Sequence, residues 1–343
     1  MEHAVNNAVN NRERAEDFSP RGASGASATS ATRPGCESAS HAKPAERTAR
    51  RGFSLVIPSI KDPRVTVAAA QTLWVVLGAT VYYFNRDPFR LGITLLTACG
   101  IDFLVALIRR REILVPISAY LTALSIGILL ESYDWRIYVV AAAWGILSKY
   151  LVRNRTGHFF NPSNFGLVTA LLLCPHIATI APGSQWGADY RIAFAIIALG
   201  LLMMIRIRRL DLALAWIGGY VFMSFVRMAL GQGGLVFALG PMTGAEFALF
   251  TFVMLPDPKA SPPTPRGRIL WGLSIALLDG VLRYLEVRYS MFYALFILCA
   301  TLPILRWSAA RSGLTEREFW KHWKIPFGGR AATPATVSAA EPA

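Results

Sequence analysis

The sequence predicts an all-α polytopic membrane protein of about ten transmembrane helices, arranged as two inverted five-helix repeats. The first observation is composition: 54% of the 343 residues are hydrophobic and only 16% are charged. The second is that the apolar residues gather in blocks, which is typical of membrane proteins. The third is that clusters of basic residues follow every second block, as the positive-inside rule requires.

The apolar blocks supply the predicted crossings. Several are slightly shorter than the roughly 20 residues that a perpendicular transmembrane helix needs, so their ends are approximate. The blocks are residues 65–84, 91–108, 114–130, 137–152, 165–181, 191–207, 211–228, 241–256, 269–284 and 289–305.

Basic residues predict the orientation. The links after the second, fourth, sixth and eighth blocks are rich in Arg and Lys, as in the run from Arg109 to Arg111, and the alternate links are poorer. This alternation places both termini in the cytoplasm, for a multi-pass protein of a bacterial-type inner (plasma) membrane. It also accounts for the net charge of +14 without a nucleic-acid partner; the predicted environment is the lipid bilayer.

Three regions follow along the chain. Residues 1–52 have almost no large apolar side chains and predict a disordered cytoplasmic tail rather than a signal peptide. Residues 53–307 form the membrane domain, with halves 65–181 and 191–305, and an odd number of helices per half gives the halves opposite orientations. Residues 308–343 predict a cytoplasmic interfacial helix, rich in aromatic and basic residues, and a disordered tail.

Two motifs together resemble a family of membrane subunits, the D subunit of the Rnf complex (RnfD) and the B subunit of the sodium-translocating NADH:quinone reductase (NqrB). The first motif is the turn from His158 to Gly166, which contains Asn161-Pro162. The second runs from Asp257-Pro258 to Arg266-Gly267-Arg268. The resemblance covers residues 55–307 and implies two inverted repeats, similar in shape to urea and ammonium transporters, in a complex that couples electron flow to cation movement.

Members of that family carry FMN on a threonine that ends a Ser/Thr-Gly-Ala-Thr motif. Here Thr243-Gly244-Ala245 matches the first three positions, but Glu246 stands at the acceptor position. A carboxylate has no hydroxyl to esterify, so no covalent FMN site is predicted. FMN or riboflavin is expected to bind non-covalently or not at all, and in this the chain is closest in kind to the stand-alone UnbU-like membrane proteins of enediyne biosynthetic clusters.

Five residues are candidates for cofactor binding: Asn161, Asn164, Thr243, Gly244 and Asp257. Asn161 and Asn164 have a structural alternative, because either amide can cap the helix that follows Pro162. Asp257 also has one, a pairing with Arg266 or Arg268 that would fasten the cytoplasmic loop.

Acidic residues within the apolar blocks are candidates for an ion or proton pathway, because such groups are costly in a bilayer and usually functional. Glu246 begins a predicted broken helix, where free backbone N–H groups stabilise a carboxylate. Its alternative is a pairing with Arg227 or solvation. Asp279 has Arg283 four residues on, at the spacing of a local helical ion pair.

Asp102 is the third pathway candidate, and its alternative is to reach toward the cluster at Arg109. No catalytic residue and no metal site is predicted, because histidines and cysteines lack any nucleophile or ligand spacing. Aromatic residues near the ends of the blocks predict membrane-interface anchors. They are Trp135, Tyr138, Trp271 and Tyr289.

The leading functional hypothesis is an RnfD/NqrB-like subunit in which electron transport is coupled to ion or small-solute transport. As an enzyme it would be at most a subunit of a redox-driven complex, with membrane or cytoplasmic redox or biosynthetic proteins as partners. Two alternatives stay open, a flavin-free secondary transporter or channel and a membrane anchor for a biosynthetic or redox assembly.

Overall fold

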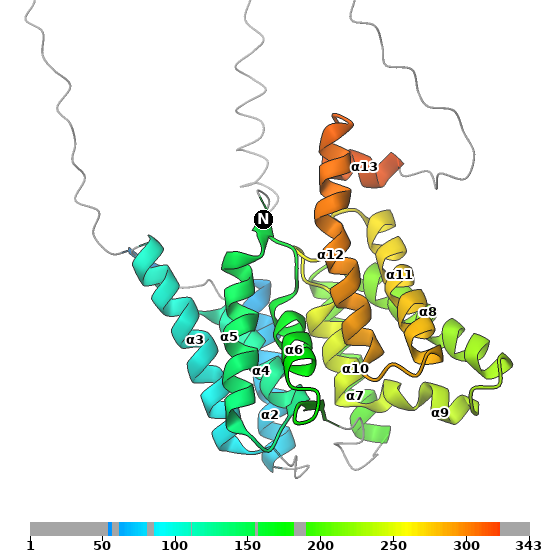
Figure 1. Cartoon of the computed structure of the whole chain (residues 1–343), viewed down its shortest axis with the longest axis horizontal. Coiled ribbons are helices and arrows are strands. Elements are labelled where there is room, and N and C mark those ends of the chain that lie inside the picture. The colour runs from blue at the N-terminus through cyan, green and yellow to red at the C-terminus, as the bar shows by residue number, and fades with distance from the viewer. Residues whose placement is uncertain are drawn as a thin grey trace, which may run out of the picture. The chain divides into compact units, whose positions relative to one another are not determined.

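The structure is a computed structural model that describes residues 54–56, 62–80, 86–110, 112–154, 157–181 and 190–322. The predicted disordered tail of residues 1–52, and the part of the C-terminal segment after His322, lie outside the described residues. The described part is mostly helical (Figure 1). The described residues belong to one compact unit.

Each predicted apolar block contains a helix, because a long apolar run satisfies its backbone hydrogen bonds internally when it is helical. The first half holds α2 (Pro63–Thr80), α3 (Pro88–Arg110), α4 (Ile117–Leu129), α5 (Trp135–Leu151) and α6 (Pro162–Leu173). The second half holds α7 (Tyr190–Arg206), α8 (Leu210–Ala229), α9 (Leu235–Leu239), η1 (Gly240–Thr243), α10 (Ala245–Leu249), η2 (Phe250–Met254), α11 (Pro265–Tyr284) and α12 (Ser290–Arg311).

Among the described residues, three helices are long and apolar enough to cross a membrane, and a bent pair would make a fourth. The three are Pro88–Arg109, Leu210–Ala229 and Ser290–Arg311. This fits a membrane protein. Helices α4 and α6 are apolar but shorter, so the architecture of ten crossings in inverted repeats stays a prediction.

Short strands pair the loops at the helix ends. Strand β1 (Ser54–Val56) pairs in parallel with β2 (Glu112–Leu114), and β3 (Leu130–Glu131) pairs antiparallel with β6 (Thr179–Ile180). Strands β4 (Arg153–Asn154) and β5 (Gly157–His158) form an antiparallel pair. The last pair leads directly into the turn before α6.

The predicted break at the eighth block is confirmed. The segments Leu235–Thr243 and Ala245–Met254 are bent by 61°, and Gly244 between them is extended, with φ −90° and ψ 155°. Beyond the bend the helix widens into a π-turn, in which the Leu255 N–H donates to the Phe250 carbonyl at 2.9 Å. Turns of this kind often occur at functional sites.

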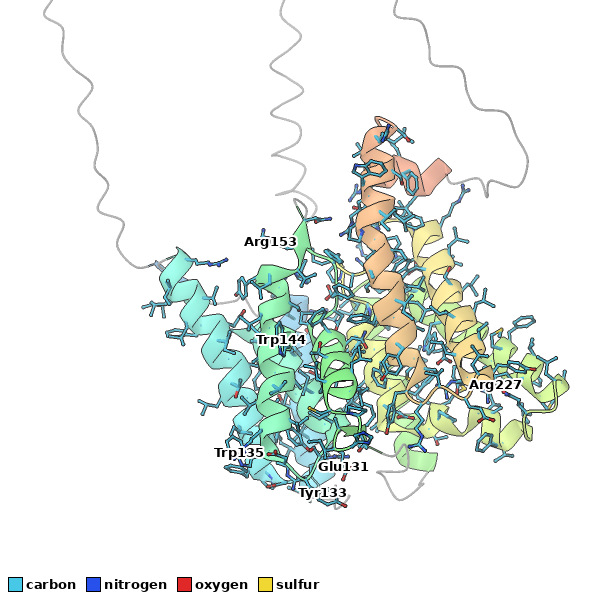
Figure 2. The ribbon with its side chains drawn as sticks, viewed as in Figure 1. Glu131, Tyr133, Trp135, Trp144, Arg153 and Arg227 are labelled. Atoms are coloured by element: carbon cyan, nitrogen blue, oxygen red, sulfur yellow. The ribbon has the colours of Figure 1, made fainter. Side chains whose placement is uncertain are left out.

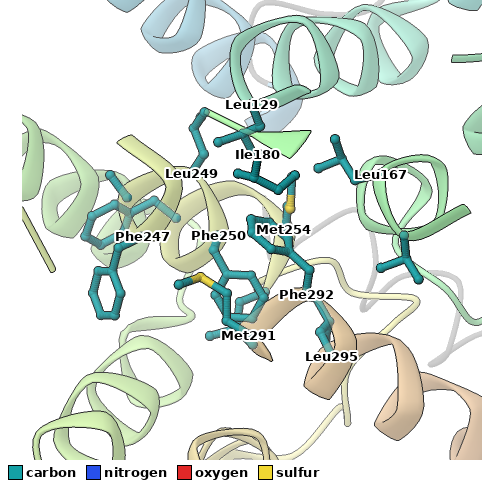
Figure 3. Close-up of a cluster of buried hydrophobic side chains, with 14 of the residues drawn as sticks. Leu129, Leu167, Ile180, Phe247, Leu249, Phe250, Met254, Met291, Phe292 and Leu295 are labelled. Atoms are coloured by element: carbon teal, nitrogen blue, oxygen red, sulfur yellow. The ribbon is translucent and has the colours of Figure 1, made fainter. Parts of the chain in front are cut away.

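The centre of the core lies where the two halves meet, an apolar contact that we call the seam (Figure 3). Leu129 of α4 and Leu167 of α6 come from the first half, and Phe250 of η2 and Phe292 of α12 come from the second. All four side chains are fully buried. Their burial holds the halves together.

Glycines allow close helix packing within each half. A Cβ on Gly166 of α6 would lie 2.3 Å from the Ala141 carbonyl oxygen of α5. A Cβ on Gly219 of α8 would lie 2.6 Å from the Ala276 Cβ of α11. Small residues at such contacts are typical of packed membrane helices.

Exposed aromatic residues mark the N-terminal end of α5 (Figure 2). Tyr133 is 97% and Trp135 44% exposed at the N-terminal end of α5, and the exposed Arg153 lies beyond the opposite end. The prediction of interface anchors is wrong for Tyr138 and Trp271, which are buried. Both rings pack inside the protein, where the Tyr138 hydroxyl donates to the Leu130 carbonyl at 3.0 Å.

Helix α13 (Glu316–His322) forms in the predicted interfacial segment and packs on α11 and α12. The ring of Trp320 is buried beside Gly267, where a Cβ on the glycine would lie 3.1 Å from it. Arg306 of α12 pairs with Glu316 at 3.1 Å and donates to the Lys259 carbonyl at 3.0 Å. The helix is thereby joined to the loop that follows η2.

Candidate functional site: a cavity between the two halves

A cavity of about 560 Å³ lies where the two predicted halves meet. The first half lines it with the starts of α2 and α4 and with the turn before α6. The second half lines it with the end of α7, with η2 and with the loop after η2. Its volume is within the range of small-molecule sites.

The turn before α6 places polar groups at this cavity. Asn161 is the N-cap of α6, and its Oδ1 accepts from the Asn164 N–H at 3.0 Å. Pro162 occupies the first helical position, where a missing N–H costs nothing. The capping alternative is therefore confirmed for Asn161, and its amide nitrogen remains available to the opposite half.

That amide meets Asp257. Asn161 Nδ2 donates to Asp257 Oδ2 at 3.4 Å, and His158 Nε2 lies 3.7 Å from the same oxygen. Asp257 Oδ1 accepts from the Lys259 N–H at 2.9 Å. We call Asp257, Asn161 and His158 the clasp, because these residues join the two halves at the wall of the cavity.

The clasp also sets the ionisation of Asp257. Burial alone would raise the pKa of this carboxyl. The hydrogen bond and charge of His158, the Lys259 N–H and the charge of Lys149 outweigh burial and hold the pKa of Asp257 below its ordinary value.

The predicted pairing of Asp257 with Arg266 or Arg268 is wrong. Arg268 pairs with Asp211 of α8, with Nη2 and Oδ2 2.6 Å apart, and Arg266 is exposed. Arg268, in the first turn of α11, points toward the start of α8. Asp257 instead finds its side-chain partners in the opposite half.

The other cofactor candidates lie elsewhere. Asn164 is buried in the seam, where its Nδ2 donates to the Phe292 carbonyl at 3.1 Å and its Oδ1 has no partner among the described residues. Thr243 is exposed and donates to the Gly240 carbonyl at 2.8 Å, and Gly244 lies in the bend before α10. Of the five candidates, only Asn161 and Asp257 line the cavity.

A second charged cluster lies at the opposite ends of α8, α11 and α12. The predicted pair of Asp279 and Arg283 is confirmed, with Oδ2 and Nε 2.8 Å apart. Asp279 Oδ1 also accepts from the Ser290 hydroxyl at 2.6 Å. Asp279 is 1% exposed, so these partners offset the cost of its burial.

Glu246 is half-buried beside this cluster, within the electrostatic reach of Arg283 and Asp279. It makes no hydrogen bond or ion pair to any other residue that the structure describes. The predicted alternative partner, Arg227, instead donates from Nε to Gln232 Oε1 at 3.3 Å. Glu246 is therefore a carboxyl with charged neighbours and no fixed partner in the described part of the chain.

Asp102 is buried between α3 and α5. It accepts from the Tyr150 hydroxyl at 2.7 Å and lies 3.5 Å from Lys149 Nζ. The predicted reach toward Arg109 is wrong, because α5 supplies a closer cation. The signal was present in the sequence, since Lys149 is a charged residue inside an apolar block.

Ser163 and Arg209 also line the cavity, and neither was a candidate. Ser163 follows Pro162 in the first turn of α6, a position that sequence reasoning treats as structural. Arg209 counted only as a topology determinant. Both become visible only when α6 and the end of α7 are brought together.

Comparison with known proteins finds no family model that matches this chain and no curated protein with significant sequence similarity. No group of three or more His, Cys, Asp or Glu residues within the described ranges has the arrangement of a metal site.

Proposed function

We propose that this protein is an integral membrane subunit of the RnfD/NqrB kind, in which electron transport is coupled to ion or small-solute transport. Any flavin is held non-covalently, and a protein without flavin would keep only the transport role. The cavity between the halves is the proposed ligand site.

One observation carries the proposal. The two motifs behind the family resemblance are 96 residues apart between Asn161 and Asp257, yet these side chains meet in the clasp. If each motif only stabilised its own loop, the two side chains would not need to be in contact. A binding site that both halves build together does require such a contact.

The packing of the helices supports an inverted repeat. Across the seam, contacts join α2 with α7, α4 with α10, and α6 with α12. Each is a pair of equivalent elements if the second half repeats the first. Within the halves, the contact of α3 with α5 parallels that of α8 with α11. A two-fold axis in the membrane plane would produce this pattern.

The cavity residues fit a flavin. The Asn161 amide and the Thr122 hydroxyl are hydrogen-bonding groups at its wall, and the Phe252 ring supplies an apolar surface. A bound flavin would supply one- or two-electron transfer. Glu246, at the family's flavin-attachment position, begins α10, whereas Phe252 of η2 lines the cavity near the end of the same helical segment. A flavin in this cavity would therefore not be attached at that position.

The purified full-length protein tests the redox proposal directly. We expect the blue absorbance band of a flavin, released by denaturation because the cofactor is not covalent. Asn161→Ala should reduce the flavin content, whereas Asn154→Ala at the end of β4 should not. Intact, folded protein with no such band would remove the redox role.

A flavin-free transporter is the second candidate, favoured by the position of Glu246. A carboxyl with charged neighbours and no fixed partner among the described residues can gain and lose a cation or a proton. The buried pair of Asp279 and Arg283 would keep the surroundings polar.

Glu246→Gln tests this candidate in proteoliposomes. We expect ion or proton flux to fall by about tenfold or more, because the amide keeps the size of the side chain and loses its charge. Glu286→Gln, at an exposed turn after α11, is the control and should retain flux. Equal flux in both variants would exclude Glu246 from the pathway.

A further inference from the structure

The wall of the cavity contains a hydroxyl without a partner. Ser163 is 4% exposed and lines the cavity from the first turn of α6. Neither its hydroxyl nor its backbone N–H makes a hydrogen bond to any of the described residues. The neighbouring Asn164 N–H, by contrast, is capped by Asn161. A buried serine normally finds a partner, so these two donors point to a ligand.

Cations line the same cavity. Arg64 and Arg209 take part in none of the ion pairs formed between described residues. Arg209 donates one of its five N–H groups to Ser261 Oγ at 2.7 Å. The side chain of Lys259 also lines the cavity and passes over Gly157.

The two acidic residues at the cavity are already engaged. Asp62 Oδ1 accepts from the Arg64 N–H at 2.9 Å. Asp257 accepts from the Lys259 N–H and lies within the clasp. The groups at the cavity with unused donors therefore include two guanidinium groups, the Ser163 hydroxyl and an N–H at a helix N-terminus. Together they favour an anion.

We infer that this cavity binds a ligand through a phosphate group. Guanidinium forks and helix N-terminal donors match phosphate oxygens. Val67, Leu121 and Phe252 on the same wall would contact an apolar remainder of the ligand. A soluble phosphate ester and a phospholipid headgroup present the same chemistry. The inference uses the proposed cavity but requires neither flavin nor electron transfer.

The full-length protein in phosphate-free detergent tests the inference. One arm adds inorganic pyrophosphate, against chloride at equal ionic strength. The other adds short-chain phosphatidic acid, against phosphatidylcholine of the same chain length. The readouts are thermal stabilisation and titration calorimetry. We expect saturable binding in at least one arm. Pyrophosphate binding identifies a soluble ester, and binding confined to phosphatidic acid identifies a lipid headgroup.

Matched variants locate the binding. Ser163→Ala and Arg209→Gln should each weaken it by about tenfold, the cost of losing one hydrogen bond to a charged group. Arg206→Gln, on the exposed last turn of α7, should bind as the wild type does. Ser163→Ala removes one atom, so misfolding is not expected to obscure its result.

Two outcomes would overturn the inference: no binding in either arm, or equal loss in Arg206→Gln and Arg209→Gln. The flavin spectrum is measured separately. Protein without a flavin band that still binds phosphate would lose the redox proposal alone, and protein with the band but no phosphate binding would lose the present inference alone.

Discussion

Asp257 shows how one side chain can hold two halves of a protein together. Its carboxylate accepts from its own loop through the Lys259 N–H and from the opposite half through Asn161. The sequence shows that a carboxylate follows η2, but its partners depend on which loop packs against it. Short-range spacing was sufficient for Asp279 and Arg283, which are one helical turn apart, and misleading for Asp257.

Asp257→Asn should lower the stability of the protein at pH 7 by about 1–3 kcal/mol, the usual cost of disrupting a hydrogen-bonded charged group that is largely shielded from solvent. The pKa of Asp257 is lowered by folding, so its contribution is present above the ordinary carboxyl pKa and is lost as the pH falls through the native value. Thermal melts in detergent should therefore separate the two proteins at pH 7 and converge only below about pH 4. Convergence already at pH 6 would contradict this account.

Helix α8 packs against α11 through small residues, and its two adjacent glycines serve different purposes. Gly219 faces α11, whereas nothing lies within 4 Å of a Cβ on Gly218. The helical pattern predicts the existence of α8, but not which glycine lies at a contact. That distinction comes from the packing of α11.

Gly219→Ala should destabilise the protein by about 1–3 kcal/mol, because the added methyl group overlaps Ala276 and forces the helices apart. Gly218→Ala is the control. It should be neutral or stabilise the helix by up to about 1 kcal/mol, since alanine loses less backbone entropy. Thermal or denaturant unfolding in the same detergent compares them. Similar loss in both variants would assign the effect to helix propensity instead.

At the scale of the whole molecule, the sequence predicted where helices form and where the eighth block breaks, because apolar runs and a small polar turn such as Thr243-Gly244-Ala245 are local signals. It did not predict the cavity. Ser163, Arg209 and Lys259 belong to three separate segments of the chain, and they line one cavity only because the two halves meet. The number of crossings also depends on a membrane, which the chain alone does not define.

Cysteine labelling tests whether α5 crosses the membrane. In a variant without the native cysteines, Tyr133→Cys and Arg153→Cys place one thiol beyond each end of this helix, at exposed positions. A membrane-impermeant maleimide added to intact cells should label Tyr133→Cys alone, because basic links face the cytoplasm. Labelling of both positions after lysis is the control. Equal labelling in intact cells would rule out a crossing at α5.

The packing of Trp320 against Gly267 has a practical consequence. Shortening the chain before Trp320 would uncover Gly267 in the Arg-Gly-Arg turn, and shortening it before Glu316 would also remove the partner of Arg306. Affinity tags and reporters should therefore be fused after His322, where they leave Trp320 packed against Gly267.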